Sequence, residues 1–229
     1  MTDGDVPAGD RPGARLLDLV ALMDRLRSPG GCPWDAAQTH ASLVPYLLEE
    51  AYEAVEAVET GDRSALREEL GDVLLQVVFH ARVASEDPDA PWDVDAVAGD
   101  LIDKLVRRHP HVFASEEATT PDEVEASWET LKREEKGRTS AVDGVPLAQP
   151  ALALAAKLMA RAEKSGLHVA VPAALSEGLP DRPLAADEVG ALLLAVVARA
   201  REDGVDAELA LRTAARGYAG AVRAAEARS

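Results

Sequence analysis

This sequence of 229 residues is poor in aromatic side chains, since Trp, Tyr and Phe together make up only 3% of it. Its hydrophobic residues, 47% of the chain, are mostly Ala, Leu and Val. A composition rich in alanine and poor in aromatics favours closely packed helices over a β-sandwich. No segment alternates polar and apolar residues as a strand would. The composition therefore predicts an all-α protein, long enough for one large domain or two small ones.

The sequence predicts no disulfides, no membrane spans and no signal peptide. The chain has a single cysteine, Cys32, which argues against a disulfide framework and is typical of a reducing cytoplasm. No apolar run approaches the roughly 18 residues of a membrane-spanning helix. The acidic start, rich in Pro and Gly, lacks the pattern of a signal peptide. We therefore expect a cytoplasmic protein with no membrane partner.

Positive charge is scarce in the first part of the chain, and the net charge is −17. Residues 1–145 contain 14 Lys and Arg against 31 Asp and Glu, whereas residues 146–229 contain 10 of each. Such a surplus of acids repels the phosphates of nucleic acid, so we expect no nucleic-acid partner. The surplus is explained either by solubility or by carboxylates that bind a divalent metal ion.

Helical periodicity and the positions of Gly and Pro divide the chain into parts. We expect a disordered tail over residues 1–12, a catalytic domain over 13–136, a linker over 137–146 and a second helical module over 147–229. The segment CPWDAAQTHAS is expected to be a loop, with Pro45 in the first turn of the next helix. The expected helices cover residues 14–27, 42–59, 63–85, 94–108, 121–135, 148–165, 186–203 and 206–226.

The second and third expected helices, together with the break between them, contain nine acidic residues between positions 46 and 76. Positions three apart on a helix project from the same face. A short break between the two helices makes them antiparallel neighbours, so their acidic pairs are expected to face each other. The pairs are Glu50 with Glu53, and Glu69 with Asp72.

Four carboxylates that face one another would resist ionisation in a dry core. Hard cations remove that repulsion, and Mg²⁺ or Mn²⁺ prefers oxygen ligands and retains waters for a substrate phosphate. An ordinary exposed acidic face is the simpler alternative. A di-iron bundle would use Glu-x-x-His pairs, but the second member here is Glu53 or Asp72, which favours a hard, redox-inert metal.

Positive charge is dense only in the segment KLVRRHPHVF. Lys104, Arg107 and Arg108 stand at i, i+3 and i+4 near the end of a helix, and such groups suit phosphate oxygens. Cations that cap a helix C-terminus give the same pattern. His109 and His111 lack the further Cys or His ligands of a zinc site. Acids for metal and bases for phosphate together predict an enzyme that acts on a polyphosphate.

These segments resemble the MazG family of nucleoside triphosphate pyrophosphohydrolases over about residues 15–136. The family motif EExxE followed by ExxD is met at Glu49, Glu50, Glu53, Glu69 and Asp72. The strings that carry the resemblance are LRSPGGCPWD (26–35), QTHASL (38–43), LLEEAYEAVEA (47–57), EELGDVLLQVVFHA (68–81) and KLVRRHPHVF (104–113).

The resemblance implies a MazG-like helical bundle, a homodimer and a Mg²⁺-dependent site, with Mn²⁺ as a substitute. The implied reaction converts a nucleoside triphosphate and water to the monophosphate and pyrophosphate, by attack of a metal-activated water on the α-phosphorus. The metal ligands implied are Glu50, Glu53, Glu69 and Asp72, and the triphosphate contacts implied are Lys104, Arg107 and Arg108.

Three residues of the resemblance have two interpretations each. Glu49 either orients the attacking water or is a structural acid on the neighbouring face. Trp34 either shapes a nucleobase pocket or anchors its loop. Trp128, in SWETLKREEK, either contacts the nucleotide, as a similar tryptophan of the family does, or packs between helices. Cys32 has no activating base, so we expect it to have a packing role.

The last third of the chain resembles a repeat of the first module that has lost its site. Residues 69–78 and 188–197 are identical at six of ten positions, but Ala191 stands where the first copy has Asp72. No EExxE helix precedes the second copy, and the basic cluster is missing. We expect a catalytically inactive module that is kept for packing or dimerisation.

Two other functions stay open at the level of sequence. A related all-α pyrophosphohydrolase with a narrow substrate, such as dUTP or phosphoribosyl-ATP, would use the same metal site. A non-catalytic module that binds a nucleotide or a protein partner is disfavoured by the five intact acids. The preferred base, the preferred sugar and the physiological role cannot be derived from these residues.

Overall fold

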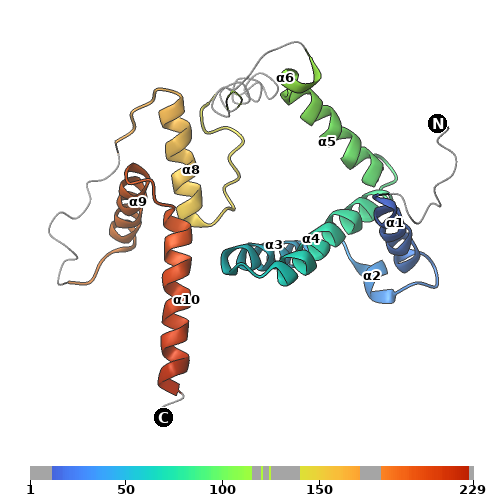
Figure 1. The fold of residues 1–229 in the computed structure, drawn as a ribbon, viewed down its shortest axis with the longest axis horizontal. Helices are drawn as coiled ribbons and strands as arrows, with labels where there is room; N and C mark the ends of the chain where they lie inside the picture. The colour runs from blue at the N-terminus through green and yellow to red at the C-terminus, as the bar shows by residue number, and fades with distance from the viewer. Residues whose placement is uncertain (1–11, 115–119, 121–123, 125–139, 171–181, 227–229) are drawn as a thin grey trace. The chain divides into compact units, whose positions relative to one another are not determined.

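The computed structural model describes residues 12–114, 120, 124, 140–170 and 182–226. Every regular element in these residues is a helix, which confirms the all-α prediction (Figure 1). The chain forms two compact units, Met1–Glu125 and Ala126–Ser229. The helices are α1 (Ala14–Arg27), α2 (Pro33–Ala37), α3 (His40–Thr60), α4 (Arg63–Ala84), α5 (Val94–Arg108), α6 (Pro110–Phe113), α8 (Ala151–Lys164), α9 (Ala186–Glu202) and α10 (Ala207–Glu226).

The prediction of a continuous loop before the second helix was wrong. A short helix, α2, occupies Pro33–Ala37, with a proline at its first position, where the missing N–H costs nothing. The next helix, α3, begins at His40 because Thr39 and Ser42 form a capping box: the Ser42 N–H donates to Thr39 Oγ1 at 3.2 Å, and Ser42 Oγ accepts from the Thr39 N–H at 2.9 Å. Pro45 therefore lies inside α3 and not in its first turn.

Some of the predicted elements lie outside the described residues. Almost all of the helix predicted for residues 121–135 lies outside them, and so do residues 1–11 of the predicted tail. The predicted linker, residues 137–146, is described only from residue 140, where the chain forms turns and Val145 is buried. The limits of the two predicted modules stay predictions.

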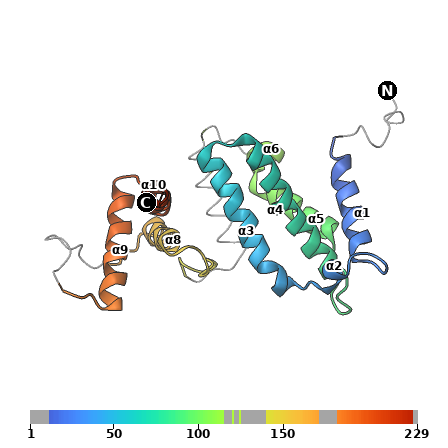
Figure 2. The ribbon, with the colours of Figure 1, turned by 90° about the horizontal axis from the view of Figure 1, so that it is seen from below.

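The two acidic helices form an antiparallel pair joined by a two-residue turn. Gly61 ends α3 with φ 74°, a left-handed conformation that glycine adopts without strain. Asp62 then starts α4, because its carboxylate accepts the N–H groups of Ser64 and Ala65 at 2.9 and 3.0 Å. Figures 1 and 2 both show α3 and α4 side by side along their length.

The core of the first unit lies at the end of this pair where α1 packs against α4. Met23 of α1, Leu43 of α3, and Val78 and Phe79 of α4 are almost fully buried and contact one another. Leu19, Val20 and Leu26 of α1, together with Leu74, Leu75, Val83 and Val94, pack around them in part. This apolar cluster fixes one end of the α3–α4 pair, and the acidic residues lie closer to its other end.

One buried arginine ties three segments of this end together. Arg27, only 9% exposed, donates to both carboxylate oxygens of Glu86 at 3.0 and 2.8 Å. It also donates to the carbonyl oxygens of Asp35 and Gln38, which close α2, at 2.6 and 3.0 Å. Its guanidinium lies 5.8 Å from the centre of the Phe79 ring. Arg27 thereby holds α2 and the end of α4 against α1.

The second unit packs α9 against α8 and α10. Arg201 of α9 donates to the Ala156 carbonyl of α8 at 3.0 Å and to the Glu163 carboxylate at 2.8 Å. On the repeated segment of α9, Val197 is fully buried, whereas Val189, Leu193 and Val196 are between 39% and 49% exposed. The predicted apolar face of α9 is therefore only partly covered within its unit.

None of the described helices combines the length and the apolar character that crossing a bilayer requires.

We predict that Arg27→Met lowers the free energy of unfolding by about 1.5–3 kcal/mol, the range for hydrogen bonds to charged groups, because it removes the hydrogen bonds of a buried guanidinium to Glu86 and to two helix-end carbonyls. Chemical denaturation measures this loss. Arg25→Met, in the same helix at an exposed position, is the matched control and should change stability by less than about 0.5 kcal/mol.

The same contact gives a pH dependence. Hydrogen bonds and charge from Arg27 and Arg82 lower the pKa of Glu86 below 4.5. The stabilisation is therefore complete above the ordinary carboxyl pKa and is lost as the pH falls through the lowered one. Arg27→Met should flatten the fall in stability below about pH 4.5; an equal fall in both proteins would contradict the assignment.

Candidate functional site

The turn between α3 and α4 sets a register that brings three predicted ligands together. Glu50 of α3 and Glu69 and Asp72 of α4 each offer a carboxylate oxygen, and these atoms lie within 4.8 Å of one another. All three side chains are half-buried. This acidic group, Glu50, Glu69 and Asp72, is the one cluster with metal-ligand character found among the described His, Cys, Asp and Glu residues.

Burial and mutual repulsion raise the pKa of two of these carboxyls, Glu50 and Glu69, above the ordinary value. Burial and then the charges of Asp72, Glu53 and Glu69 raise the pKa of Glu50, which also shares a hydrogen bond with Glu53. Burial and the charges of Glu53, Glu68 and Asp72 raise the pKa of Glu69. A cation between the carboxylates would reverse the sign of these interactions.

The other two acids of the motif have different positions. Glu53 is exposed, yet it acts on the pKa values of both Glu50 and Glu69, so it lies at the edge of the acidic group. Glu49 is exposed and is not among the clustered ligands. Its two interpretations, a water-orienting residue and a structural acid, both stay predictions.

The acidic group fits a hard divalent cation. Its donors are all carboxylate oxygens, the ligands that Mg²⁺ and Mn²⁺ prefer. Because the carboxylate oxygens lie within 4.8 Å of one another, a positive charge between them would offset the repulsion that helps to raise the pKa values of Glu50 and Glu69. Neither helix offers the Glu-x-x-His pattern of a di-iron bundle at these positions.

The predicted phosphate-binding residues lie on α5, which contacts α4. Lys104 and Arg108 are half-buried and Arg107 is exposed. Figure 1 shows α5 leaving the end of α4 and running away from the α3–α4 pair toward α6. The structure therefore clusters the acids with one another but does not bring the basic residues to them, and the phosphate contacts stay a prediction.

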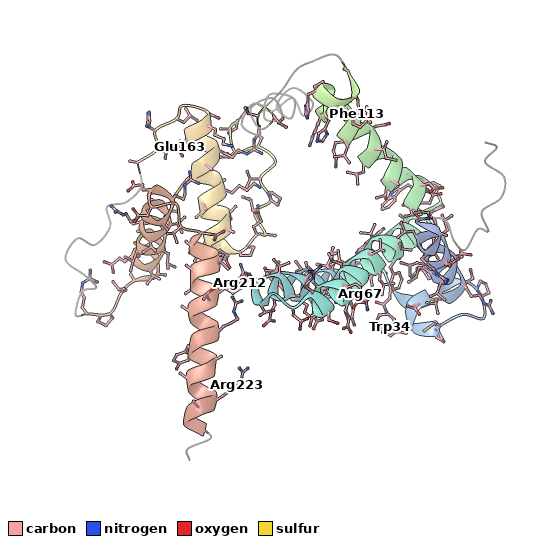
Figure 3. The ribbon with its side chains drawn as sticks, in the orientation of Figure 1. Trp34, Arg67, Phe113, Glu163, Arg212 and Arg223 are labelled. Carbon is pink, nitrogen blue, oxygen red and sulfur yellow. The ribbon has the colours of Figure 1, made fainter. Side chains whose placement is uncertain are left out.

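The two predicted aromatic residues have different outcomes. Trp34 lies on α2 (Figure 3) and makes edge contacts with Tyr46 of α3, ring centres 5.8 Å apart, and with Phe79 of α4, 6.5 Å apart. It remains 52% exposed, so it anchors α2 and still offers a free face. Trp128 lies outside the described residues.

Sequence reasoning missed the polar residues that continue the acidic face of α4. Gln76 follows Asp72 by four positions, and His80 follows Gln76 by four, so all three share one helix face. Gln76 is only 5% exposed, and its Oε1 has no hydrogen-bond partner; the same is true of His80 Nε2. His80 contacts His40 of α3. The spacing from Asp72 would have revealed this row.

The second copy of the repeat uses its remaining acid differently. Glu188, which corresponds to Glu69, receives a two-pronged ion pair from Arg182 at 2.6 and 2.9 Å and the Ala185 N–H at 2.9 Å. These contacts lower the pKa of Glu188 to about 2. The carboxylate caps the start of α9, and Ala191, at the position that corresponds to Asp72, supplies no second carboxylate.

Comparison with known proteins agrees with the motif. The MazG nucleotide pyrophosphohydrolase domain matches residues 38–113, which contain the acidic group and the basic residues of α5. A protein of Streptomyces cacaoi described as an uncharacterized 26.1 kDa protein is 56% identical, covering 95% of this chain and 85% of its own length.

Two relatives carry functional names. The nucleoside triphosphate pyrophosphohydrolase of Mycobacterium tuberculosis is 45% identical over 93% of this chain, which spans only 59% of that protein. The nucleoside triphosphate pyrophosphohydrolase/pyrophosphatase MazG of Thermotoga maritima is 39% identical over 90% of this chain and 83% of its own length. With the acidic group formed by the motif residues themselves, these matches show that the chain belongs to the MazG family of nucleotide pyrophosphohydrolases.

Proposed function

We propose that this protein is a divalent-metal-dependent nucleoside triphosphate pyrophosphohydrolase. The observation that carries the proposal is the acidic group, in which Glu50, Glu69 and Asp72 converge from two helices at the positions of the family motif. The substrate class follows from the family and from the functional names of the relatives. The reaction adds water to the α-phosphorus, breaks its bond to the bridging oxygen and releases pyrophosphate and the monophosphate.

Each part of the site has one task in this reaction. Glu50, Glu69 and Asp72, with Glu53 at their edge, would hold Mg²⁺, for which Mn²⁺ is expected to substitute. When bound, that cation supplies Lewis acidity at phosphate oxygens and lowers the pKa of water. Lys104, Arg107 and Arg108 are the groups that would neutralise charge on the leaving pyrophosphate.

The nucleoside would be held by the residues around α2. Trp34 keeps a free face while its edge is fixed by Tyr46 and Phe79, and a rigid exposed indole is suited to stacking on a base. Glu49 and Trp128 are further candidates for orienting the water and the nucleotide. A cytoplasmic location, which the single cysteine favours, completes the proposal.

We further propose that the protein acts as a homodimer. One face of α3, opposite to the acidic group, carries a stripe of large apolar side chains that are 39–62% exposed, and α5 carries another that is 41–58% exposed. Exposed apolar patches of this extent mark interfaces. Two α3–α4 pairs that pack on these stripes would form a four-helix bundle. The stripes are Val44, Leu48, Tyr52, Val55 and Val58 on α3, and Leu101, Ile102, Leu105 and Val106 on α5.

The second module is proposed to be inactive. Its one acid in the repeated segment, Glu188, is already neutralised by Arg182, and Ala191 supplies no ligand. The apolar residues of α9 that stay exposed suit a packing role, either in the dimer or against the first unit.

The first prediction concerns the activity itself. With Mg²⁺, the protein should convert nucleoside triphosphates to monophosphates and pyrophosphate, and chelation of the metal should abolish turnover. Pyrophosphate release with a panel of ribo- and deoxynucleotides, including dUTP and phosphoribosyl-ATP, measures this and separates a broad enzyme from a narrow one. Release of orthophosphate with a diphosphate product would contradict the proposal.

The metal ligands are tested by a matched pair of variants. Glu69→Gln should weaken Mn²⁺ binding about tenfold or more, and should raise the melting temperature of the metal-free protein because it removes a charge that Glu53, Glu68 and Asp72 repel. Glu188→Gln, the corresponding change in α9, should leave Mn²⁺ binding unchanged. Calorimetric titration measures the Mn²⁺ affinity of both variants. If Glu69→Gln and wild type had equal affinities, the metal would bind elsewhere.

The dimer is tested by light scattering. The full chain should have twice the mass of one protomer, and Leu48→Glu should shift it toward the monomer, because a carboxylate in the middle of the apolar stripe would be buried without a partner. Glu56→Lys, at an exposed polar position of the same helix, is the control and should leave the mass unchanged. A wild-type chain of monomer mass would exclude the dimer.

A further inference from the structure

Three aromatic rings from three different segments form a stack at the end of the α3–α4 pair that is remote from the turn. His40, the first residue of α3, lies parallel to His80 of α4, with ring centres 5.1 Å apart and planes inclined by 7°. On the connection that leads into α5, Trp92 stacks on His40 at 6.1 Å and 19°. The stack therefore joins the start of α3, the end of α4 and the segment from which α5 begins.

The contact between the two imidazoles limits how many protons they hold. Their Nδ1 atoms are 2.7 Å apart, which is a hydrogen bond in which one nitrogen donates and the other accepts. A first added proton preserves this bond, because a protonated ring still donates to a neutral one. A second added proton leaves an N–H on both Nδ1 atoms, and the bond is then impossible.

From this geometry we propose that the His40–His80 pair is a pH-sensitive latch. Through Trp92 it holds the α4–α5 connection on the α3–α4 pair, and it releases this connection when both rings are protonated.

Burial and charge place the release on the acidic side of neutrality. Burial, and after it the charge of His40, lower the pKa of His80 below 6.5. His80 Nε2 is buried without an acceptor, so nothing compensates a charge on that ring. Because the closed form binds fewer protons than the open one, the latch is stable above the ordinary histidine pKa and is lost as the pH falls below it.

Several charged groups on the surrounding elements are engaged in other contacts. Arg82 binds Asp24 and Glu86, and Arg27 binds Glu86. Asp87 and Asp93 accept backbone N–H groups of their own turns. Only burial and His40 act on the pKa of His80, so no carboxylate offsets the repulsion between the two rings. The remaining acids on these segments are Asp35 of α2, Asp89 and Asp95.

The consequence of release concerns α5. Trp92 immediately precedes Asp93, which caps α5 by accepting the Ala96 N–H. When His40 leaves His80, Trp92 loses the platform that orients this cap. The placement of the basic residues Lys104, Arg107 and Arg108 relative to the α3–α4 pair then changes with pH. The acidic group stays in place, because the turn between α3 and α4 is unaffected.

The decisive measurement follows the exposure of Trp92 in the full chain. In the Trp34→Phe/Trp128→Phe background, where Trp92 is the sole tryptophan, acrylamide quenching should increase as the pH falls from about 7.5 to 5, with an opening equilibrium that rises about tenfold per pH unit. His80→Phe keeps a ring in the stack but takes no proton, and should make quenching independent of pH. His109→Gln, at a histidine outside the stack, should leave the pH dependence unchanged.

A second measurement needs no variant. In NMR titrations of the histidine side chains, the pKa of His80 should lie below 6.5. The proposal is overturned if quenching of Trp92 does not change over this pH range, if it changes equally in His80→Phe, or if His80 titrates at 6.5 or above. None of these readouts depends on catalysis, so the result stands apart from the test of the enzymatic activity.

Discussion

The register of one antiparallel helix pair determines both polar clusters of the first unit. Gly61 and Asp62 reverse the chain in two residues, by a left-handed glycine and an aspartate cap. Once this turn is fixed, Glu50 must lie opposite Glu69 and Asp72, and His40 must lie opposite His80. A slip of one residue would rotate each helix face by about 100° and separate both groups. The acidic group and the histidine stack are thus two consequences of the same turn.

Electrostatic strain is distributed unequally along this pair. At the core end, Arg27 and Arg82 neutralise Glu86 and Asp24, and the apolar residues Met23, Leu43 and Phe79 exclude water. Nearer the turn, the charged neighbours that act on Glu50 and Glu69 are other carboxylates, and together with burial they raise the pKa values of both. A stable end therefore supports a strained one, which is the arrangement that a site for a cation requires.

The repeated helix shows how a small change in surroundings redirects an acid. Glu69 and Glu188 occupy the same place in related segments, yet the pKa of one is raised and that of the other is lowered to about 2. The first has carboxylates as neighbours on an adjoining helix, and the second has Arg182 and a helix N-terminus. The difference lies in what precedes each helix: a second acidic helix for α4, and a segment with an arginine for α9.

The sequence by itself determined the all-α class, the bounds of several helices and the family. Helical periodicity gave α1 and α5 their bounds, and the strings around Glu50 and Asp72 were specific enough to identify the MazG motif. Local capping was harder to foresee: the Thr39–Ser42 box moved the start of α3, and Pro33 began a helix in an expected loop. Only the tertiary structure decided that Glu50, Glu69 and Asp72 converge while Glu49 does not, that Gln76 is buried and His80 half-buried, and that Arg27 joins three segments. These outcomes depend on which faces of two helices meet, and that is fixed by contacts between residues far apart in the chain, such as His40 with His80 and Arg27 with Glu86.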